Sequence, residues 1–424
     1  MTFAIGVAIL LGLMVLAVPI GYALGIAGVI SLNMLVPFGM IETLLGKVVH
    51  GTVASSIMLT IPMFILMAEF LACGGVATDL LLACNRLLRK VRGGLAMACI
   101  FAGAIHAAAT GSSTASAASL ARASFPAMMK AGYSPQLAVG TISIAGTLAI
   151  MIPPSVAFVI YGVVTETSIG KLFLAGVTPG LMTMLGYILT ISLTLKFKPE
   201  WGPSDADKER AMAEERGGRV WPMFLLIVVV LGGLYSGIAT PTEVAAIGAF
   251  GALLISVFSG RMTTNSFTHA LGGTMRITSM IMMIIISAHV VGYFISFTKI
   301  TDTLLEWIAA SGMSPVQAML IVVLIYLILG MFMDQAAVLI LTAPISTPLM
   351  VGLGFDPVWW GVIMIKTTEI GLVTPPLGMV VFVTGSSTRT DLRKSFAGVT
   401  PFIIAEFVTL ALLLAFPAIT LWLT

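Results

Sequence analysis

Charged residues are scarce in this sequence: Asp, Glu, Lys and Arg make up only 9% of its 424 residues. Soluble domains average about 25% charged residues, so the composition excludes a soluble globular protein. Hydrophobic residues reach 58%, and the mean hydropathy is +1.09. The alternating-hydropathy segments of about ten residues that form membrane β-barrels are also absent. The composition therefore indicates an all-α, polytopic membrane protein.

Residues that carry out catalysis or bind metals are few and scattered. The three cysteines, Cys73, Cys84 and Cys99, share no metal-ligand spacing, and the four histidines form no cluster. We expect the cysteines to be packing residues. Neither HExxH nor GxSxG occurs, and no basic patch carries interleaved aromatic residues. We therefore predict neither an enzyme nor a nucleic-acid-binding protein, and no organic cofactor.

The apolar segments predict five membrane spans in each half of the chain. The N-terminal sequence MTFAIGVAILLGLMVLAVPIG has no basic n-region and no small-residue cleavage site, so we expect a first span rather than a signal peptide. The predicted spans of the first half are 2–17, 21–38, 52–75, 136–163 and 179–197. Those of the second half are 222–238, 242–260, 274–298, 358–385 and 398–422.

The prolines reveal an internal repeat with an offset of 222 residues. Residues 126–179 and 348–401 each contain five prolines, and all five align without a gap. The first window holds Pro126, Pro135, Pro153, Pro154 and Pro179, and the second holds Pro348, Pro357, Pro375, Pro376 and Pro401. The segment AGVTP occurs in both windows, at 175–179 and 397–401. The sequence therefore predicts two copies of one module.

The loops of the two copies differ in charge. Residues 196–219 hold six basic and six acidic side chains, and we predict a cytoplasmic linker at 198–219. The loop at 308–316 has no basic residue, whereas its first-half counterpart carries Arg86, Arg89, Lys90 and Arg92. Conversely, a second-half loop holds three basic residues, Arg389, Arg393 and Lys394. Its first-half counterpart holds one, Lys171. Under the positive-inside rule the copies then have opposite orientations, with both termini in the periplasm.

Each copy also contains a segment that we predict to be a re-entrant helical hairpin. Residues 98–130 are too long for one span and are interrupted by TGSSTAS (110–116), where small and hydroxylated residues allow a tight turn. Adding 222 to Ser112 gives Asp334, which predicts a second hairpin at 316–349 that turns at Asp334. An acidic residue inside an apolar segment is a candidate for a functional site.

A Pro–Pro pair interrupts one span in each copy. Each proline removes a backbone donor and disfavours helical angles in the residue before it. Because an unpaired carbonyl in hydrocarbon costs several kcal/mol, such a break must face protein or a wet cavity. We therefore predict two broken helices, at 136–163 and 358–385.

Two hairpin tips and two helix breaks near the membrane midplane are typical of secondary transporters with inverted repeats. Hydroxyl, carboxylate and carbonyl oxygens suit Na⁺, which as a hard cation needs about five or six oxygen ligands. We predict two Na⁺ sites, one for each tip and break. The first comprises Gly111, Ser112, Ser113, Thr114, Ser116, Ile152 and Pro153. The second comprises Asp334, Gln335, Val373, Thr374 and Pro375.

An anionic substrate is expected beside these ions. We predict that Thr110, Ser113, Arg122, Glu369 and Pro376 bind it. Each of these features also has a structural alternative. The GSSTAS segment is also suited to a helix-packing face, and each Pro–Pro pair to a simple kink. Asp334 can cap a hairpin turn, Glu369 can pair across helices, and Glu243 is most simply a helix cap.

The chain resembles a known family at these residues: the large membrane subunit of TRAP transporters, the tripartite ATP-independent periplasmic carriers. The resemblance is carried by TGSSTAS, SFPAMMKAGYS, IMIPPSVAFVIYG, SGIATPTE, GMFMDQAAVLILTAP and EIGLVTPPLGM, and it covers essentially the whole chain. It implies import coupled to Na⁺ by an elevator mechanism. It also implies a small four-span partner subunit on a separate polypeptide, and a periplasmic binding protein that delivers a carboxylate or sugar acid.

The resemblance further implies a division into stationary and moving parts. Residues 1–95 and 220–313 are expected to form a scaffold, and 96–197 with 314–424 a transport domain. The segments 79–94 and 302–313 are expected to be arm helices between them. The expected location is a bacterial inner membrane. The nearest alternative is a stand-alone Na⁺/dicarboxylate symporter of the same architecture, and a channel is a further one.

Overall fold

The computed structural model describes residues 2–88, 91–110, 112–204 and 221–424. These residues form α-helices with two short 3₁₀ helices and no strand. Seven of the described helices are long and apolar enough to cross a membrane, or eight spans result if one bent helix pair is counted as a single span. The structure thus confirms the predicted all-α, multi-pass class.

The described helices follow the same order in the two halves. The first half contains α1 (Thr2–Val15), α2 (Ile20–Asn33), α3 (Phe38–Ala54), η1 (Ser56–Leu59), α4 (Thr60–Cys73), α5 (Val76–Leu88), α6 (Gly94–Thr110), α7 (Ser113–Lys130), α8 (Pro135–Met151), α9 (Val156–Val164) and α10 (Ile169–Phe197), followed by η2 (Pro199–Trp201). The second half contains α12 (Trp221–Tyr235), α13 (Pro241–Phe258), α14 (Thr264–Thr298), α15 (Ile300–Ala310), α16 (Pro315–Phe332), α17 (Gln335–Gly352), α18 (Pro357–Val373), α19 (Met379–Thr388), α20 (Leu392–Ala415) and α21 (Ala418–Leu421). The bounds of α7 and α17 differ by 222 residues at both ends, as do those of α8 and α18.

Residues 52–75 do not form the single span predicted from the sequence. Instead α3 ends at Ala54, η1 follows, and α4 begins at Thr60. Pro62 explains the interruption, because a proline ring inside a helix clashes with the carbonyl four residues earlier, here that of Met58. The second half has Ile284 at the position of Pro62 (62 + 222), and there α14 runs unbroken from residue 264, ten residues before the predicted start at 274.

Two further helices begin earlier than predicted because polar side chains cap them. α10 begins at residue 169 rather than 179, and α20 begins at residue 392 rather than 398. Ser168 accepts a hydrogen bond from the backbone N–H of Lys171, and Asp391 accepts one from that of Arg393. Such caps favour a helix start at that point, so Pro179 and Pro401 lie inside helices rather than at their ends. The predicted span 398–422 is also interrupted, since α20 ends at residue 415 and α21 is separate.

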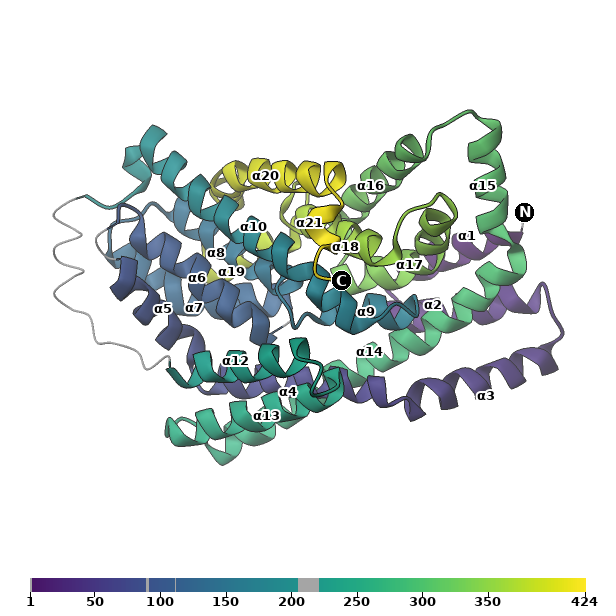
Figure 1. The fold of residues 1–424 in the computed structure, drawn as a ribbon, viewed down its shortest axis with the longest axis horizontal. Helices are drawn as coiled ribbons and strands as arrows, with labels where there is room; N and C mark the ends of the chain where they lie inside the picture. The colour runs from purple at the N-terminus through teal and green to yellow at the C-terminus, as the bar shows by residue number, and fades with distance from the viewer. Residues whose placement is uncertain (1, 89–90, 111, 205–220) are drawn as a thin grey trace.

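The helices pack in two groups (Figure 1). In one group, α4 packs against α13 and α14, α2 against α14, and α12 against α13; α4, α12, α13 and α14 lie along the lower side of the view. In the other group, α8 packs against α6, α7 and α20, and α18 packs against α16, α17 and α20. α8 is buried from Leu137 to Met151, and α18 is buried from Val358 to Val373. The two helices that precede the Pro–Pro pairs therefore form the core of this second group.

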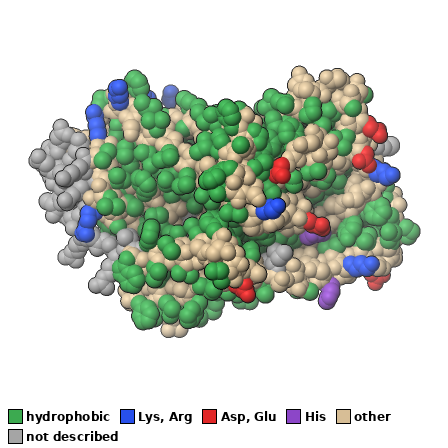
Figure 2. All heavy atoms as spheres, in the orientation of Figure 1, with side chains coloured by type: hydrophobic (Ala, Val, Ile, Leu, Met, Phe, Trp, Pro, Cys, Tyr) green, Lys and Arg blue, Asp and Glu red, His purple; other side chains and the backbone are tan. Residues whose placement is uncertain are grey.

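The basic loops meet at one end of the molecule. A Cβ on Gly93, in the turn between α5 and α6, would lie 2.5 Å from the side chain of Leu195, near the end of α10. The backbone N–H of Ser134 donates to the carbonyl of Trp201 at 3.0 Å, and Gly398 of α20 packs on the carbonyl of Gln136. Lys and Arg side chains are seen at the left of Figure 2, and Asp and Glu side chains are seen mainly in the right half of that face, where further Lys and Arg side chains also lie.

The opposite end is where α9 finishes and α18 begins. The hydroxyl of Tyr161, near the end of α9, donates to the carbonyl of Pro357 at 2.7 Å. The hydroxyl of Thr347 in α17 donates to that of Tyr161 at 3.1 Å. α8 therefore begins at the basic end, beside Trp201, and α18 begins at the other end.

Candidate functional site

The first hairpin connection is shorter than predicted. α6 ends at Thr110 and α7 begins at Ser113, so the connection is 111–112 rather than 110–116. Ser112 has extended backbone angles and is the N-cap residue of α7; its Oγ lies 3.4 Å from Oγ1 of Thr114. Thr114 and Ser116 belong to the first turn of α7 and not to an irregular tip. Gly111 and the side chain of Thr110 lie outside the described residues.

The start of α7 packs closely against α8. Ser113 and Ser116 are buried, and Ser116 Oγ has no hydrogen-bond partner among the described residues. A Cβ on Gly146 would lie 2.6 Å from Cβ of Ala117, so glycine lets the two helices approach here, shortly before α8 ends at Met151. A buried hydroxyl without a partner is unusual in a folded protein and leaves Ser116 Oγ available to a ligand. The contact of Ala117 with Gly146 brings the start of α7 close to α8 near the first break.

The second hairpin turns at the predicted residue. α16 ends at Phe332 and α17 begins at Gln335, and Asp334 is the N-cap residue of α17. Its Oδ2 accepts a hydrogen bond from the backbone N–H of Ala336 at 3.1 Å. The capping alternative is therefore present in the structure. Because a carboxylate offers about four acceptor positions, this single bond leaves capacity for a further ligand.

Two glycines bring the second tip toward the second break. A Cβ on Gly371 of α18 would lie 2.6 Å from the backbone Cα and C of Gly330 in α16. Gly330 precedes Asp334 by one helical turn, and Gly371 precedes Thr374 by three residues. The close backbone approach is possible only because both residues lack a side chain. The predicted ligands Asp334 and Thr374 are therefore held at neighbouring helix ends, with Gln335 buried beside them.

Both Pro–Pro pairs interrupt their helices as the sequence predicted. α8 ends before Ile152 and Pro153, and α18 ends at Val373 before Thr374 and Pro375; both Pro–Pro peptide bonds are cis. At each break a side-chain hydroxyl donates a hydrogen bond to a backbone carbonyl. Ser155 Oγ donates to the carbonyl of Ile150 at 2.5 Å, and Thr374 Oγ1 donates to the carbonyl of Ile370 at 2.6 Å. These bonds satisfy carbonyls near positions where proline supplies no N–H.

The two breaks differ in exposure. Pro153 and Pro154 are buried, and Pro154 faces Met67 of α4 and Leu226 of α12. Pro375 and Pro376 are exposed on the protein. The first break is therefore covered by the other helix group, and the second is not.

The residues predicted to bind the substrate differ in exposure, and the side chain of Thr110 lies outside the described residues. Ser113 is buried at the start of α7, whereas Arg122 is exposed on the same helix. Pro376 is exposed at the second break. Glu369 is fully buried inside α18 and pairs with Lys366 of the same helix, not with a residue on another helix as the alternative proposed. Glu243 likewise forms the capping box predicted for it, with Thr240.

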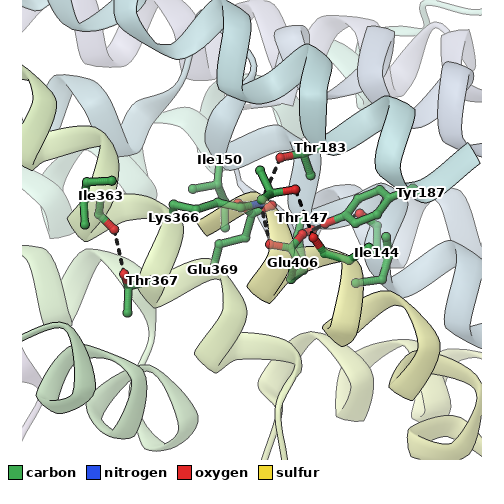
Figure 3. A network of polar contacts seen from close by, with 12 residues as sticks. Ile144, Thr147, Ile150, Thr183, Tyr187, Ile363, Lys366, Thr367, Glu369 and Glu406 are labelled. Carbon is green, nitrogen blue, oxygen red and sulfur yellow. Dashed lines mark hydrogen bonds and ion pairs between the residues drawn. The ribbon is translucent and has the colours of Figure 1, made fainter. Parts of the chain in front are cut away.

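Sequence reasoning missed a buried ionic cluster around Lys366 (Figure 3). Lys366 Nζ lies 3.1 Å from Oε2 of Glu369, forms an ion pair with Glu406 of α20, and donates to Thr183 Oγ1 of α10 at 3.0 Å. All three charged side chains are 0% exposed. We call Lys366, Glu369 and Glu406 the Lys366 cluster. The sequence does hold an indication of this cluster, because Lys366 and Glu406 are charged residues inside predicted membrane spans.

A separate cavity of about 1040 Å³ lies between the two helix groups. Its walls come from α3, η1, the start of α4, the α9–α10 connection, the start of α13 and the C-terminal part of α14. The lining is mostly apolar, with hydroxyl groups from Thr52, Ser56, Thr60, Thr167, Ser168 and Thr242. Lys47, Glu166 and Glu243 add charge at its walls. The α9–α10 connection places this cavity toward the end opposite the basic loops, and the predicted ion ligands do not line it.

Comparison with known proteins identifies relatives along the whole chain. Residues 7–419 match the family described as the DctM component of the tripartite ATP-independent periplasmic transporter. The C4-dicarboxylate TRAP transporter large permease protein DctM of Pseudomonas aeruginosa is 36% identical over 365 residues, covering 86% of this chain and 85% of that protein. The protein of the same description from Vibrio cholerae is 31% identical over 438 residues, covering 98% and 96%.

A solved transporter structure shares the fold. The Alcanivorax borkumensis YdaH transporter, whose crystal structure is described as having an unusual topology, superposes with a TM-score of 0.62. The match covers 89% of each chain at 15% sequence identity. At this identity the similarity concerns the fold alone.

Proposed function

This chain belongs to the DctM family, the large permease subunits of TRAP transporters, and from this premise we propose that it imports an organic anion, coupled to inward Na⁺ flow. The family works with a small membrane subunit and a periplasmic binding protein. We propose both as partners of this chain. The observation that carries the proposal is the pairing of each hairpin with a Pro–Pro break through close glycine contacts, at Gly146 and at Gly371.

We propose that the two halves are inverted copies of one module. The identical offset of α7 with α17 and of α8 with α18 supports this proposal. So does the direction of the broken helices, since α8 begins beside Trp201 at the basic end and α18 begins at the opposite end. Inverted repeats with discontinuous helices are a recurring architecture of secondary transporters, in which the helix breaks meet near the bilayer midplane.

Two Na⁺ sites follow from this arrangement. The first uses oxygens of residues 111–116 with those near Ile152 and Pro153; the unpartnered, buried Oγ of Ser116 supports it. The second uses Asp334 with Gln335, Val373, Thr374 and Pro375, and the contact of Gly330 with Gly371 supports it. Carboxylate, hydroxyl and carbonyl oxygens are the ligands that a hard monovalent cation requires.

We propose an elevator mechanism in which the group built around α8 and α18 moves against the group built around α4, α13 and α14. The predicted division at residues 96–197 and 314–424 agrees with the packing of the described helices into these two groups. The unequal exposure of the two breaks supports it as well. In one state of a carrier, the access path is closed on one side of the membrane and open on the other, so one break is expected to be covered and the other exposed.

The proposed location is a bacterial inner membrane, with the basic end in the cytoplasm and both termini in the periplasm. The cavity between Lys47 of α3 and Glu166 of the α9–α10 connection would then open toward the periplasm. We propose that the substrate leaves its binding protein at this cavity. Hydroxyl groups along the walls suit a polar, carboxylate-bearing solute. A C4-dicarboxylate is the first substrate to test, because the relatives described above are named for it.

Reconstitution tests this proposal. Vesicles that contain the permease with its small subunit should take up labelled succinate when both the binding protein and an inward Na⁺ gradient are present. Omitting either should reduce uptake to that of empty vesicles. Uptake without the binding protein would instead support the stand-alone symporter. Uptake that neither saturates nor depends on Na⁺ would support a channel and overturn the carrier.

A further inference from the structure

The Lys366 cluster contains one more acidic than basic group. Lys366 supplies one positive charge, and Glu369 and Glu406 supply two negative charges when both are ionised. None of the three side chains is exposed, and Lys366 is the one fully buried Lys or Arg among the described residues. An uncompensated charge in a protein interior costs several kcal/mol even after relaxation. The cluster therefore needs one further positive charge in order to be neutral.

The hydrogen bonds of the cluster indicate where that charge binds. Two N–H donors of Lys366 are used by Thr183 and by Oε2 of Glu369, and Nζ also forms an ion pair with Oε2 of Glu406. Oε1 of Glu369 and both carboxylate oxygens of Glu406 are buried without a hydrogen-bond partner among the described residues. Thr147 lies beside them in Figure 3, but its hydroxyl donates to the carbonyl of Ile144 at 2.9 Å. A buried carboxylate oxygen without a donor is costly, and a proton on either carboxyl group removes that cost.

No other described cation is positioned to supply the charge. Tyr187 of α10 is an ionisable neighbour, since it bonds to Thr147 at 3.3 Å. Tyr161 and Tyr326 contact α18 near its other end, at Pro357 and Trp360. The other ionisable residues on the helices that surround the cluster lie near helix ends. On α10 these are Lys171 and Lys196, and on α20 they are Arg393 and Lys394. Cap positions hold Asp334 (α17), Asp356 (α18), Arg389 (α19) and Asp391 (α20). His106 is on α6, which packs on α8 and α10 rather than on α18 or α20.

We propose that the Lys366 cluster is a proton-binding site that holds one proton, shared between Glu369 and Glu406, in addition to the two proposed Na⁺ sites. The added proton changes the net charge of the cluster from −1 to zero. The site joins α18, which leads to the second Pro–Pro break, to α10 and α20. Proton binding therefore stabilises the arrangement of these three helices, and loss of the proton weakens it.

Infrared spectroscopy of the purified permease in lipid tests this assignment. At neutral pH the wild-type protein should show the C=O stretch of a protonated carboxylic acid, shifted in D₂O. Glu406→Gln and Glu369→Gln should each abolish this band, because one carboxylate then remains to neutralise Lys366. Lys366→Met should roughly double the band, because both carboxyl groups must then be neutral. Glu243→Gln is the matched control, since Glu243 is an exposed capping residue, and it should leave the band unchanged.

Three results would overturn the proposal. One is the absence of the band in the wild-type protein, and another is its persistence in both Gln variants. The third is a band that appears only after Na⁺ is replaced by choline, because the site would then hold Na⁺ rather than a proton. The Gln variants keep the size of the side chain, so their folding is expected to be preserved; an unchanged thermal unfolding temperature verifies this. The outcome does not depend on transport activity, so it is distinguishable from failure of the proposed function.

Discussion

Single residues decide how the proposed ion sites work, and Asp334 is the most specific of them. Its carboxylate both caps α17 and lies beside the second break. We predict that Asp334→Ala raises the Na⁺ concentration needed for half-maximal uptake by about tenfold or more, because a charged ligand is lost; tenfold corresponds to about 1.4 kcal/mol. Reconstituted uptake measured over a range of Na⁺ concentrations reports the change.

Asp356 provides the matched control. It caps α18 by accepting hydrogen bonds from the backbone N–H groups of Val358 and Trp359, and it is far along α18 from Thr374. Asp356→Ala should cost about 1 kcal/mol of stability, as any lost cap does. It should leave the Na⁺ dependence unchanged. If both variants show the same Na⁺ dependence, Asp334 is only a structural cap and the prediction is contradicted.

Glycine contacts carry the packing at the second site. We predict that Gly371→Ala destabilises the protein by about 1–3 kcal/mol, because the new Cβ would meet the backbone of Gly330 at 2.6 Å. Gly272→Ala is the control, since a Cβ there meets nothing within 4 Å. It should be neutral or slightly stabilising. Thermal unfolding in lipid nanodiscs measures both, and equal unfolding temperatures would contradict the close approach.

At the residue scale, the sequence could single out candidate residues but not their arrangement. Asp334 and the Pro–Pro pairs stand out because they are polar residues or breaks inside apolar segments. Lys366 and Glu406 carry the same signal, but their partnership is invisible in the sequence, because they are 40 residues apart and on different helices. Glu369 was recognised, and only the structure assigns its carboxylate to Lys366.

At the scale of elements, the proposed mechanism depends on the broken helices. Replacing Pro375 and Pro376 with alanine should allow α18 and α19 to join, so that the carbonyls near Thr374 form helical hydrogen bonds. We predict that Na⁺-driven uptake then falls to background while the protein still inserts and remains monodisperse. Size-exclusion chromatography and vesicle uptake report the two properties.

Pro344→Ala is the control for this change. Pro344 lies inside α17, away from both breaks, and its removal restores an ordinary helical N–H donor. Uptake should be retained. Full uptake in the Pro375/Pro376 double variant would show that an intact helix serves equally well, and would contradict the role given to the break.

Helix starts were the least predictable feature of the elements. The apolar pattern located the spans, but Ser168 caps α10 and Asp391 caps α20 before the predicted first residues, Pro179 and Gly398. A cap competes with a proline as a helix start, and the sequence alone does not decide which one prevails. The interruption before α4 coincides with Pro62 in its first turn, but α10, α17 and α20 continue through their prolines, so a proline alone does not predict a break.

At the scale of the whole molecule, the elevator proposal predicts that linking the two helix groups stops transport. Phe64 of α4 and Phe173 of α10 stack edge to face, with ring centroids 6.1 Å apart. In a background without the three native cysteines, Phe64→Cys with Phe173→Cys should lose uptake when Hg²⁺ bridges the thiols and regain it when the metal is removed. Phe70→Cys with Phe267→Cys is the control, because α4 and α14 belong to the same group and the two rings stack with centroids 5.7 Å apart. Inhibition of both pairs alike would contradict the proposed motion.

The most direct test of the whole account is which side of the membrane each loop faces. Single cysteines at Arg86, Lys171, Ser311 and Arg393 are all on exposed positions and can be labelled with an impermeant thiol reagent in oriented vesicles. Two inverted copies predict that positions 86 and 393 react from the cytoplasmic side and that 171 and 311 react from the periplasmic side. Labelling of 86 and 311 from one side, with 171 and 393 from the other, would mean that the copies are parallel, and would contradict the account.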